Sequence, residues 1–267
     1  MKKFLLIIIA ASFLVGCQHK ESKLINNEIL SESEHLVMSA NWFQKSAEMR
    51  ACFYQTYNLA ELKLKEHKEN YKGEKPTAVI LDIDETILDN SPYEKYLIDN
   101  GELYSGSTWK QWSDKASAKA LPGALEFTIM AKELGVEVIY ISNRKVNELK
   151  STVNNLLNIG FPNADTNFIY LRELDKSSDK TERRAKIMEQ YEVLLFIGDN
   201  LTDFSQTFAE RNSNLGFDLV DDYKNEFGNK FIILPNPMYG EWEGTIYGND
   251  YSLLPKKKRA KRKEILD

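Results

Sequence analysis

Two pairs of acidic residues each follow a short apolar run. Asp82 and Asp84 come after residues 77–81, and Asp199 and Asp203 come after residues 193–197. In an extended segment residues two apart point the same way, so Asp82 can attack phosphorus while Asp84, or its backbone carbonyl, serves proton transfer or metal binding. Four carboxylates in one pocket repel each other unless a cation neutralises them, and all-oxygen ligands favour Mg²⁺ over zinc. The pattern predicts a magnesium site and suits covalent phosphoryl transfer.

Donors and cations that suit a phosphate group lie between the two acidic pairs. Ser142, Asn143 and Arg144 follow the apolar run 136–141 directly. They offer a hydroxyl, an amide and a guanidinium to phosphate oxygens. Residues 175–180 offer two lysines, Lys176 and Lys180, as the cation beside the phosphate. We favour Lys180, because a Lys-x-x-Arg pattern continues from it into a helix, and the sequence leaves Lys176 open.

The apolar runs predict the sheet that would bring these residues together. Residues 77–83 are almost continuously apolar, as expected of a strand buried on both faces of a parallel sheet. Similar runs recur at residues 136–141, 168–171, 193–197, 215–220 and 231–234, with helical patterns between several of them. This alternation predicts an α/β fold with a doubly wound parallel sheet and helices on both faces. Such sheets bind ligands beyond the carboxyl ends of their strands, where both acidic pairs lie.

Two segments stand outside this alternation. From residue 33 to 72 the apolar residues recur at helical spacing without an interrupting proline, which predicts one or two amphipathic helices. Residues 91–121 carry turn-forming residues and many aromatics, including Trp109 and Trp112. We interpret 91–121 as a cap or substrate-side segment, with packing in the core as the alternative role for its aromatics.

Four motifs stand in order along the chain: Asp82-x-Asp84-x-Thr86, Ser142, Lys180, and Gly198-Asp199 with Asp203. They resemble the motifs of the haloacid dehalogenase (HAD) superfamily. Segments 80–91, 142–144 and 198–204 look more narrowly like the class C acid phosphatases, including the lipoprotein e type of 5′-nucleotidase. Ser142 stands where close relatives often have threonine, a change that keeps the hydroxyl. The resemblance covers nearly all of the mature chain and implies a smaller, mostly helical cap on the sheet.

The resemblance implies a role for each motif residue. Asp82 would be the nucleophile that becomes an aspartyl-phosphate, and Asp84 the acid that protonates the leaving alkoxide and later activates water. Mg²⁺ would be held by the Asp82 carboxylate, the Asp84 backbone carbonyl and Asp199, with Asp203 nearby. The other implied roles are phosphate neutralisation by Ser142 and Lys180, substrate binding by Asn143 and Arg144, and stacking of a nucleobase between Trp109 and Tyr239.

The first residues resemble a bacterial export signal that ends in a lipidation site. Met1-Lys2-Lys3 is positively charged, residues 4–15 are apolar but shorter than the roughly 20 residues of a membrane span, and Gly16-Cys17 resembles the end of a lipobox. We expect a lipid on Cys17 to hold the protein at the cell envelope, facing outside the cytoplasm, on the outer membrane in a Gram-negative cell. The predicted organisation is a lipoprotein signal peptide at 1–17, a polar tether at 18–32, N-terminal helices at 33–74, a catalytic core at 75–235 that includes the cap segment 91–121, and a substrate-side C-terminal segment with a basic tail at 236–267.

Composition and charge narrow the partners. The chain has 267 residues, of which 42% are hydrophobic and 28% charged, with a net charge of −5, as in an ordinary globular protein. A mildly acidic chain does not attract nucleic-acid polymers, so the expected partner is a small phosphomonoester such as a nucleotide. Cys17 and Cys52 form no zinc or redox pattern. The basic run 256–263 is either a solvated face or a contact with anionic lipid, and a homodimer is left open.

Three functions remain in competition. The leading hypothesis is a Mg²⁺-dependent acid phosphatase and 5′-nucleotidase that acts on nucleoside monophosphates and on nicotinamide mononucleotide. A sugar phosphatase or phosphotransferase would keep Asp82 and Asp84 but would not need the aromatic pair. A surface lipoprotein that binds a ligand such as haem would keep the fold without catalysis, and the intact acidic motifs argue against it.

Overall fold

A computed structural model describes residues 33–211 and 214–266 of the chain. The predicted signal peptide, the lipidation site Cys17 and the predicted tether lie outside the described residues. Within the described ranges, no helix is both long enough and apolar enough to cross a membrane.

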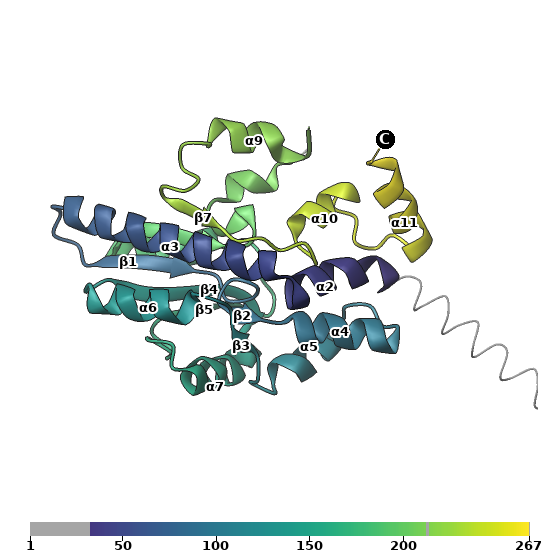
Figure 1. Cartoon of the computed structure of the whole chain (residues 1–267), viewed down its shortest axis with the longest axis horizontal. Helices are drawn as coiled ribbons and strands as arrows, with labels where there is room; N and C mark the ends of the chain where they lie inside the picture. Colours follow the sequence, from purple (N-terminus) through teal and green to yellow (C-terminus); the bar gives the residue numbers. More distant parts are fainter. Residues whose placement is uncertain (1–32, 212–213, 267) are drawn as a thin grey trace, which may run out of the picture.

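A parallel sheet forms the centre of the molecule (Figure 1). It has five strands in the order β5-β4-β1-β6-β7, and every neighbouring pair runs parallel. The strands are β1 (Thr77–Leu81), β4 (Glu137–Lys145), β5 (Ile169–Arg172), β6 (Glu192–Gly198) and β7 (Phe231–Ile233). The predicted α/β fold is confirmed, and with it the strands expected near residues 77, 136, 168, 193 and 231. Because β1 lies between β4 and β6, the carboxyl ends of three motif-bearing strands meet at one edge.

The strands have apolar side chains on both faces because the sheet is covered on both sides. In β1, Val79 and Leu81 belong to one buried cluster, whereas Ala78 and Ile80 belong to another. Successive side chains of a strand point to opposite faces, so these clusters are the two cores above and below the sheet. The first core contains side chains of helices α3 (Ala47–Asn70), α6 (Ala124–Glu133) and α7 (Leu149–Ile159). The second contains Ile187 of α8 (Thr181–Gln190) and phenylalanines that follow β6.

The N-terminal helical pattern forms two helices, α2 (Val37–Lys45) and α3. Ser46 separates them: its ψ of 139° leaves the helical region, and its hydroxyl accepts the N–H of Met49 at 3.0 Å. A serine in that geometry is an N-cap, so it ends one helix and starts the next. Helix α3 then packs along the sheet and places Tyr57 beneath the loop that follows β1, where its hydroxyl donates to the carbonyl of Thr86 at 2.8 Å.

Residues 88–120 leave the alternation of strands and helices, as the sequence pattern indicated. Helices α4 (Ser91–Asn100) and α5 (Gly106–Ser113) lie between the short antiparallel strands β2 (Leu88–Asp89) and β3 (Lys119–Ala120). They form a separate mostly helical group on one side of the sheet edge (Figure 1).

The strand predicted at residues 215–220 is wrong. The chain there forms a 3₁₀ turn, Asn214–Gly216, and helix α9 (Phe217–Asp222). Leu215 and Gly216 have φ values of 54° and 86°, which lie in the left-handed region and break an extended strand. Three aspartates in the next six residues are also poor strand formers.

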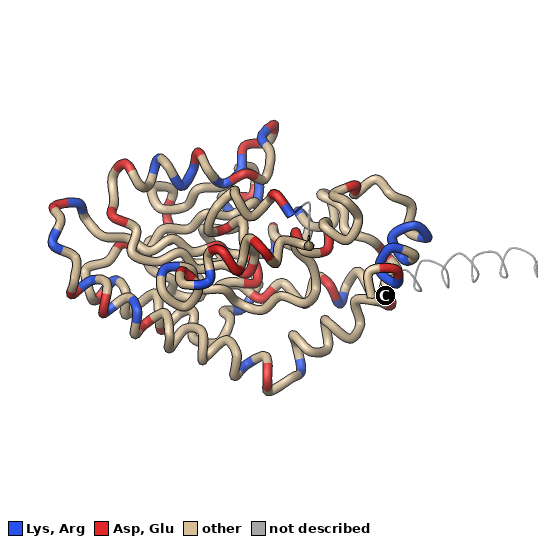
Figure 2. Tube along the Cα trace, turned by 90° about the horizontal axis from the view of Figure 1, so that it is seen from above, with Lys and Arg blue, Asp and Glu red and all other residues tan. Residues whose placement is uncertain are grey.

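The remaining elements are short or lie at the C-terminal end. They are the 3₁₀ turns Glu34–Leu36, Val146–Glu148, Leu201–Asp203 and Gln206–Ala209, and the helices α10 (Glu241–Ile246) and α11 (Pro255–Glu264). Helix α11 carries the basic run and appears as a blue segment beside the C-terminus in Figure 2. It is attached to α10 and the turn that follows it, since Arg262 donates to the hydroxyl of Tyr247 at 2.6 Å.

Candidate active site

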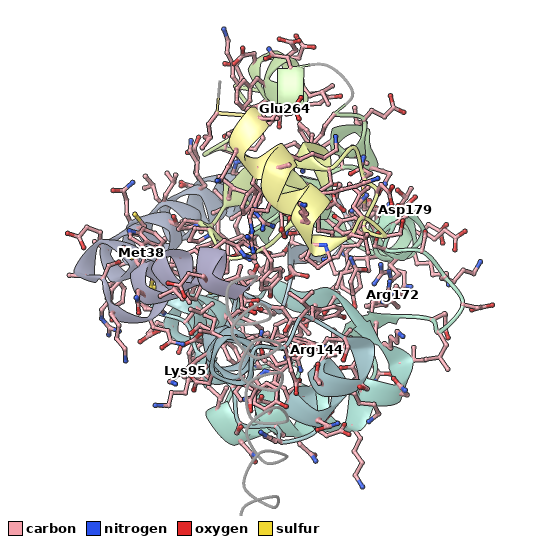
Figure 3. All side chains as sticks on the ribbon, turned by 90° about the vertical axis from the view of Figure 1, so that its right-hand side faces the viewer. Met38, Lys95, Arg144, Arg172, Asp179 and Glu264 are labelled. Atoms are coloured by element: carbon pink, nitrogen blue, oxygen red, sulfur yellow. The ribbon has the colours of Figure 1, made fainter. Side chains whose placement is uncertain are left out.

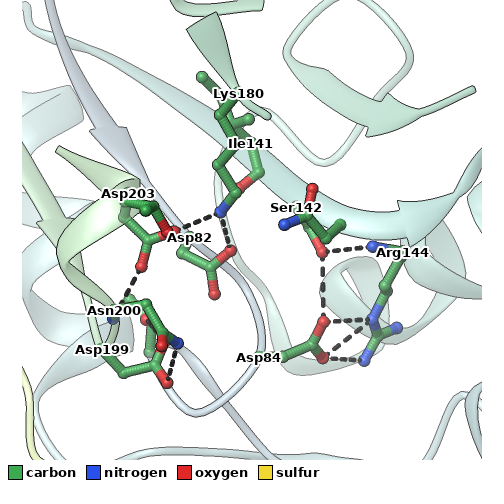
Figure 4. Close-up of polar contacts among 12 residues, drawn as sticks. Asp82, Asp84, Ile141, Ser142, Arg144, Lys180, Asp199, Asn200 and Asp203 are labelled. Atoms are coloured by element: carbon green, nitrogen blue, oxygen red, sulfur yellow. Dashed lines mark hydrogen bonds and ion pairs between the residues drawn. The ribbon is translucent and has the colours of Figure 1, made fainter. Parts of the chain in front are cut away.

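Asp82 lies just beyond the carboxyl end of β1, in the middle of the sheet. Its backbone N–H donates to the carbonyl of Ile197 on β6 at 2.9 Å, so the hydrogen bonds of the sheet fix its position. The side chain is buried and forms an ion pair with the ammonium of Lys180 (Figure 4). Burial raises the pKa of the Asp82 carboxyl well above its ordinary value despite this ion pair, and the neighbouring carboxylates add to the effect.

Lys180 reaches the cluster from the N-cap position of α8. Its ammonium donates to Asp82, to Asp203 Oδ1 at 2.6 Å and to the carbonyl of Ile141 at 2.9 Å, which occupies its three donors. Burial opposes its charge, but Asp203 and Asp82 outweigh burial and hold the pKa of Lys180 above its ordinary value. The competing Lys176 is exposed in the preceding loop. The structure therefore places Lys180, and not Lys176, beside Asp82.

Asp199 and Asp203 join the same cluster from the segment that follows β6. One oxygen from each of Asp82, Asp199 and Asp203 lies within 4.8 Å of the other two. The loop approaches β6 so closely that a Cβ on Gly198 would stand 2.3 Å from Asp203 Oδ2. Only glycine fits there, which explains why glycine precedes the acidic pair.

Neutral groups hold Asp199, in contrast to its neighbours. Its Oδ2 accepts the side-chain amides of Asn200 and Asn236, both at 2.9 Å, and the hydroxyl of Thr86 lies 3.4 Å from Oδ1. Burial and the charge of Asp203 raise the pKa of Asp199 to about 7. The cluster thus contains three carboxylates and one ammonium, and this excess of negative charge would be balanced by a divalent cation.

Asp84 points away from this cluster, toward Arg144 (Figure 4). The Arg144 guanidinium donates from Nη2 and Nε to Asp84 Oδ1 at 2.8 and 3.0 Å, and the Ser142 hydroxyl donates to Oδ2 at 3.2 Å. Arg144 itself is only 2% exposed. The Asp84 carboxylate is therefore outside the acidic triad, and only its backbone carbonyl remains for the metal role that the resemblance implied. The predicted role of Arg144 in binding substrate stays a prediction.

Trp109 lies on α5 at the wall of a pocket beside these residues. The pocket is also lined by Asn143, whose side-chain oxygen accepts from Arg183 at 2.8 Å. The Trp109 ring meets Tyr93 edge to face, with ring centroids 5.3 Å apart, and the guanidinium carbon of Arg144 lies 5.7 Å from its centroid. One aromatic of the predicted pair thus borders open space next to Asp84 and Arg144.

Tyr239 and Trp112 pack against the main core. Both are partly buried there, and Trp112 also donates to the side-chain oxygen of Asn90 at 2.9 Å. Core packing is thus observed for Trp112, and a nucleobase between Trp109 and Tyr239 stays a prediction.

Comparison with known proteins identifies the family. The model of the HAD superfamily, subfamily IIIB (acid phosphatase), matches residues 10–242. The chain belongs to this family. It is similar to the class C acid phosphatase from Bacillus anthracis, with 38% identity and a TM-score of 0.82 in each of two crystal structures. The similarity covers 87% of this chain and 96% of the form with tungstate bound, or 97% of the other. The resemblance inferred from the motifs is confirmed.

The plant relatives of this chain are less similar in sequence than the Bacillus anthracis protein. Acid phosphatase 1 of Solanum lycopersicum is 28% identical over 165 residues, and a stem 31 kDa glycoprotein of Glycine max is 27% identical over 164 residues. Each match covers 60% of this chain. The chain spans 57% and 58% of the length of these two proteins.

The acidic triad of this chain fits a divalent metal ion. Its donors are all carboxylate oxygens, they converge within 4.8 Å, and the pKa values of Asp82 and Asp199 are raised by burial and by neighbouring negative charge. Carboxylates that repel each other gain most from a shared cation. Asp82 and Asp203 both accept from Lys180, whereas among the described residues Asp199 accepts only from neutral groups, so Asp199 has the most capacity for a metal among these three carboxylates.

Three residues of the site had no role assigned from the sequence. Arg183, the arginine of the Lys-x-x-Arg pattern, donates to the carbonyl of Ser142 at 2.6 Å. Asn236 supports Asp199, and Asn90 donates to Asp84 Oδ1 at 2.8 Å. No local pattern distinguishes these two asparagines from ordinary turn residues.

Proposed function

We propose that the protein is a Mg²⁺-dependent acid phosphatase that hydrolyses phosphate monoesters, nucleoside monophosphates and nicotinamide mononucleotide among them, through an aspartyl-phosphate on Asp82. The supporting observation is the buried Asp82 that Lys180 holds beside Asp199 and Asp203 at the carboxyl end of β1. A carboxylate at this edge of the sheet is placed to meet a ligand. The relative from Bacillus anthracis was solved with tungstate, an oxyanion, which is consistent with a site for phosphate.

In the proposed first step the Asp82 carboxylate attacks phosphorus, the new O–P bond forms and the bond to the alcohol oxygen breaks. Lys180 lies against Asp82 and would stabilise the negative charge on the phosphoryl oxygens. Bound Mg²⁺ would add positive charge that orients the phosphoryl group. In the second step water attacks phosphorus, which releases inorganic phosphate and restores Asp82.

Asp84 is the proposed proton carrier, and its contacts constrain that role. Both its oxygens accept hydrogen bonds, from Arg144, Ser142 and Asn90. To protonate a leaving alkoxide, Asp84 must exchange at least one of these contacts for the substrate, since a general acid has to reach the oxygen that it protonates. We therefore propose that Arg144 positions Asp84 between turnovers and that Asp84 turns toward Asp82 when the ester binds.

The test is phosphate release from p-nitrophenyl phosphate, adenosine monophosphate and nicotinamide mononucleotide, with Mg²⁺ and with EDTA. Asp82→Asn should abolish turnover, whereas the control Asp165→Asn, on an exposed loop, should keep it. Turnover that survives Asp82→Asn would contradict the covalent mechanism. Turnover that is unaffected by EDTA would contradict the proposed dependence on Mg²⁺.

The nucleotide specificity has its own test. Trp109→Ala should raise KM for adenosine monophosphate well above its effect on p-nitrophenyl phosphate, because base stacking contributes about 1–3 kcal/mol. Equal effects on the two esters would favour a sugar phosphatase or phosphotransferase.

We also propose that the protein is anchored to the cell envelope through a lipid on Cys17 and acts outside the cytoplasm. The lipobox-like end of the apolar segment supports this. Cys17→Ala should move the protein from the membrane fraction to the soluble fraction and abolish labelling by radioactive palmitate. Labelling that persists in Cys17→Ala would refute the anchor.

A further inference from the structure

The pocket beside Trp109 is positively charged. Among the described residues that line it are the cations Lys110, Lys145 and Arg172 and a single carboxylate, Glu148. Glu148 is already engaged, since its two oxygens accept from the Ser113 hydroxyl at 2.6 Å and the backbone N–H of Lys145 at 2.7 Å. One carboxylate does not balance three cations, so the lining of the pocket carries a net positive charge.

Among the cations that line the pocket, Arg172 and Lys145 enter no ion pair within the described residues, unlike Lys110. Arg172 ends β5 and pairs in register with Lys145 of β4, so two positive side chains stand at the same edge of the sheet. Its Nε is buried and has no hydrogen-bond partner among the residues that the structure describes, where Arg172 also enters no ion pair. A buried charged donor without an acceptor is costly, so this guanidinium is suited to receive an anion.

A second arginine increases the positive charge near Arg172. Burial lowers the pKa of Arg183 to about 10, and the charge of Arg172 adds to this effect although Asp82 opposes it. Lys110, by contrast, has a partner, because it pairs with Asp114 at 2.6 Å on the surface of α5. The unsatisfied positive charge is thus concentrated at Arg172 and Lys145.

The pocket adjoins the catalytic carboxylates. Asn143 lines it and follows Ser142, the residue that donates to Asp84. Arg144 connects the two regions, since it binds Asp84 and lies against the ring of Trp109. Figure 3 shows Arg172 between Arg144 and Asp179 at this end of the molecule. An ester with its phosphate at Asp82 can therefore extend its alcohol part into the pocket.

We propose that Arg172, with Lys145, binds a second anionic group on the alcohol part of the substrate. This group is a carboxylate or a second phosphate, since both accept the paired donors of a guanidinium. The proposal rests on the proposed phosphatase function, because it concerns the same site. It predicts that, among phosphate monoesters, the enzyme prefers those whose alcohol part carries an additional negative charge.

Matched pairs of esters isolate the charge. We would compare 4-carboxyphenyl phosphate with 4-carbamoylphenyl phosphate, which has a similar size and no charge, and adenosine 3′,5′-bisphosphate with adenosine monophosphate. The charged member of a pair should have a kcat/KM at least about tenfold higher, mainly through a lower KM, as one charge-assisted hydrogen bond would give. A preference in the first pair alone assigns a carboxylate, and in the second alone a phosphate.

Arg172→Gln should bring the ratio of kcat/KM between the charged and the uncharged ester to about one. Lys145→Gln provides a second variant if Arg172→Gln does not fold. Lys65→Gln, on the exposed face of α3, changes the net charge equally and should leave the preference intact. Binding of the product alcohols 4-hydroxybenzoate and 4-hydroxybenzamide, measured by calorimetry, needs no turnover. The anion should bind at least about tenfold more tightly, and Arg172→Gln should abolish the difference.

The outcomes separate the two proposals. Turnover of neutral esters with no preference for charged ones overturns the anion pocket and leaves the phosphatase intact. If the unmodified protein turns over none of the esters, the proposed phosphatase function is overturned. The calorimetry with the product alcohols then tests the anion pocket independently of turnover. A preference that persists in both Arg172→Gln and Lys145→Gln also overturns the proposal.

Discussion

Replacing Lys180 by methionine removes the single ammonium of the acidic cluster while keeping most of the side chain's apolar volume. Lys180 is only 4% exposed, and Asp82 and Asp203 are each 7% exposed, so water would screen the remaining carboxylates poorly. Breaking a buried ion pair by removing one partner costs about 3–5 kcal/mol. Typical domains are stable by about 5–15 kcal/mol, so Lys180→Met should unfold at a much lower urea concentration.

Urea unfolding followed by circular dichroism in EDTA measures this loss. The control is Lys65→Met, which breaks an exposed helical pair with Glu61 and should cost under about 0.5 kcal/mol. Adding Asp203→Asn to Lys180→Met should restore part of the stability, because it removes one of the unpaired buried charges. A loss of less than about 1 kcal/mol in Lys180→Met would refute the reasoning, since it would show that the carboxylates are effectively solvated.

Three further predictions concern the same site. Gly198→Ala should lose activity and about 1–3 kcal/mol of stability, because its Cβ would collide with the acidic cluster; urea unfolding and phosphate release check both. Gly106→Ala, with no atom within 4 Å, should leave the free energy of unfolding unchanged. Asp84→Asn should lower kcat by about 10² or more and also destabilise the protein, because the buried Arg144 loses its charged partner. The melting temperature of the metal-free protein should fall as the pH rises from about 4 to about 7. In the folded state the pKa of Asp199 is raised to about 7, so folded Asp199 keeps a proton that the unfolded chain releases near pH 4. Saturation with Mg²⁺ should remove this pH dependence of the melting temperature.

Sequence periodicity and motif order predicted most of the fold and the candidate site. The strands beneath Asp82, Ser142 and Asp199 are apolar on both faces, which is a strong local signal, and these residues come within a few positions of a strand end, whereas Lys180 lies at the start of helix α8. In a parallel sheet the carboxyl ends share one edge, so such residues have to meet there. The convergence of Asp82, Asp199 and Asp203 follows from that geometry, and Lys180 reaches them from the N-cap of α8.

The parts that could not be predicted depend on contacts between distant segments. Arg144 pairs with Asp84, 60 positions earlier, and no local pattern specifies that pair. Its predicted role in binding substrate is not affected by this pairing and stays a prediction. The error at residues 215–220 has a different cause. A short segment with apolar residues on either side of an aspartate fits a strand or a helix turn equally well, and the left-handed conformations of Leu215 and Gly216 decided between them.

The distribution of partners among the carboxylates indicates where a metal ion would contribute most. Lys180 pairs with Asp82 and Asp203, and Arg144 pairs with Asp84, so the two cations that contact these carboxylates already have partners. Asp199 has only neutral donors around it within the described ranges. Because neutral donors compensate a buried charge less than a cation does, Asp199 gains most from bound Mg²⁺. Asp199→Asn should therefore weaken Mg²⁺ binding more than Asp203→Asn does, and equal losses of affinity, measured by calorimetry, would show that the two carboxylates hold the ion alike.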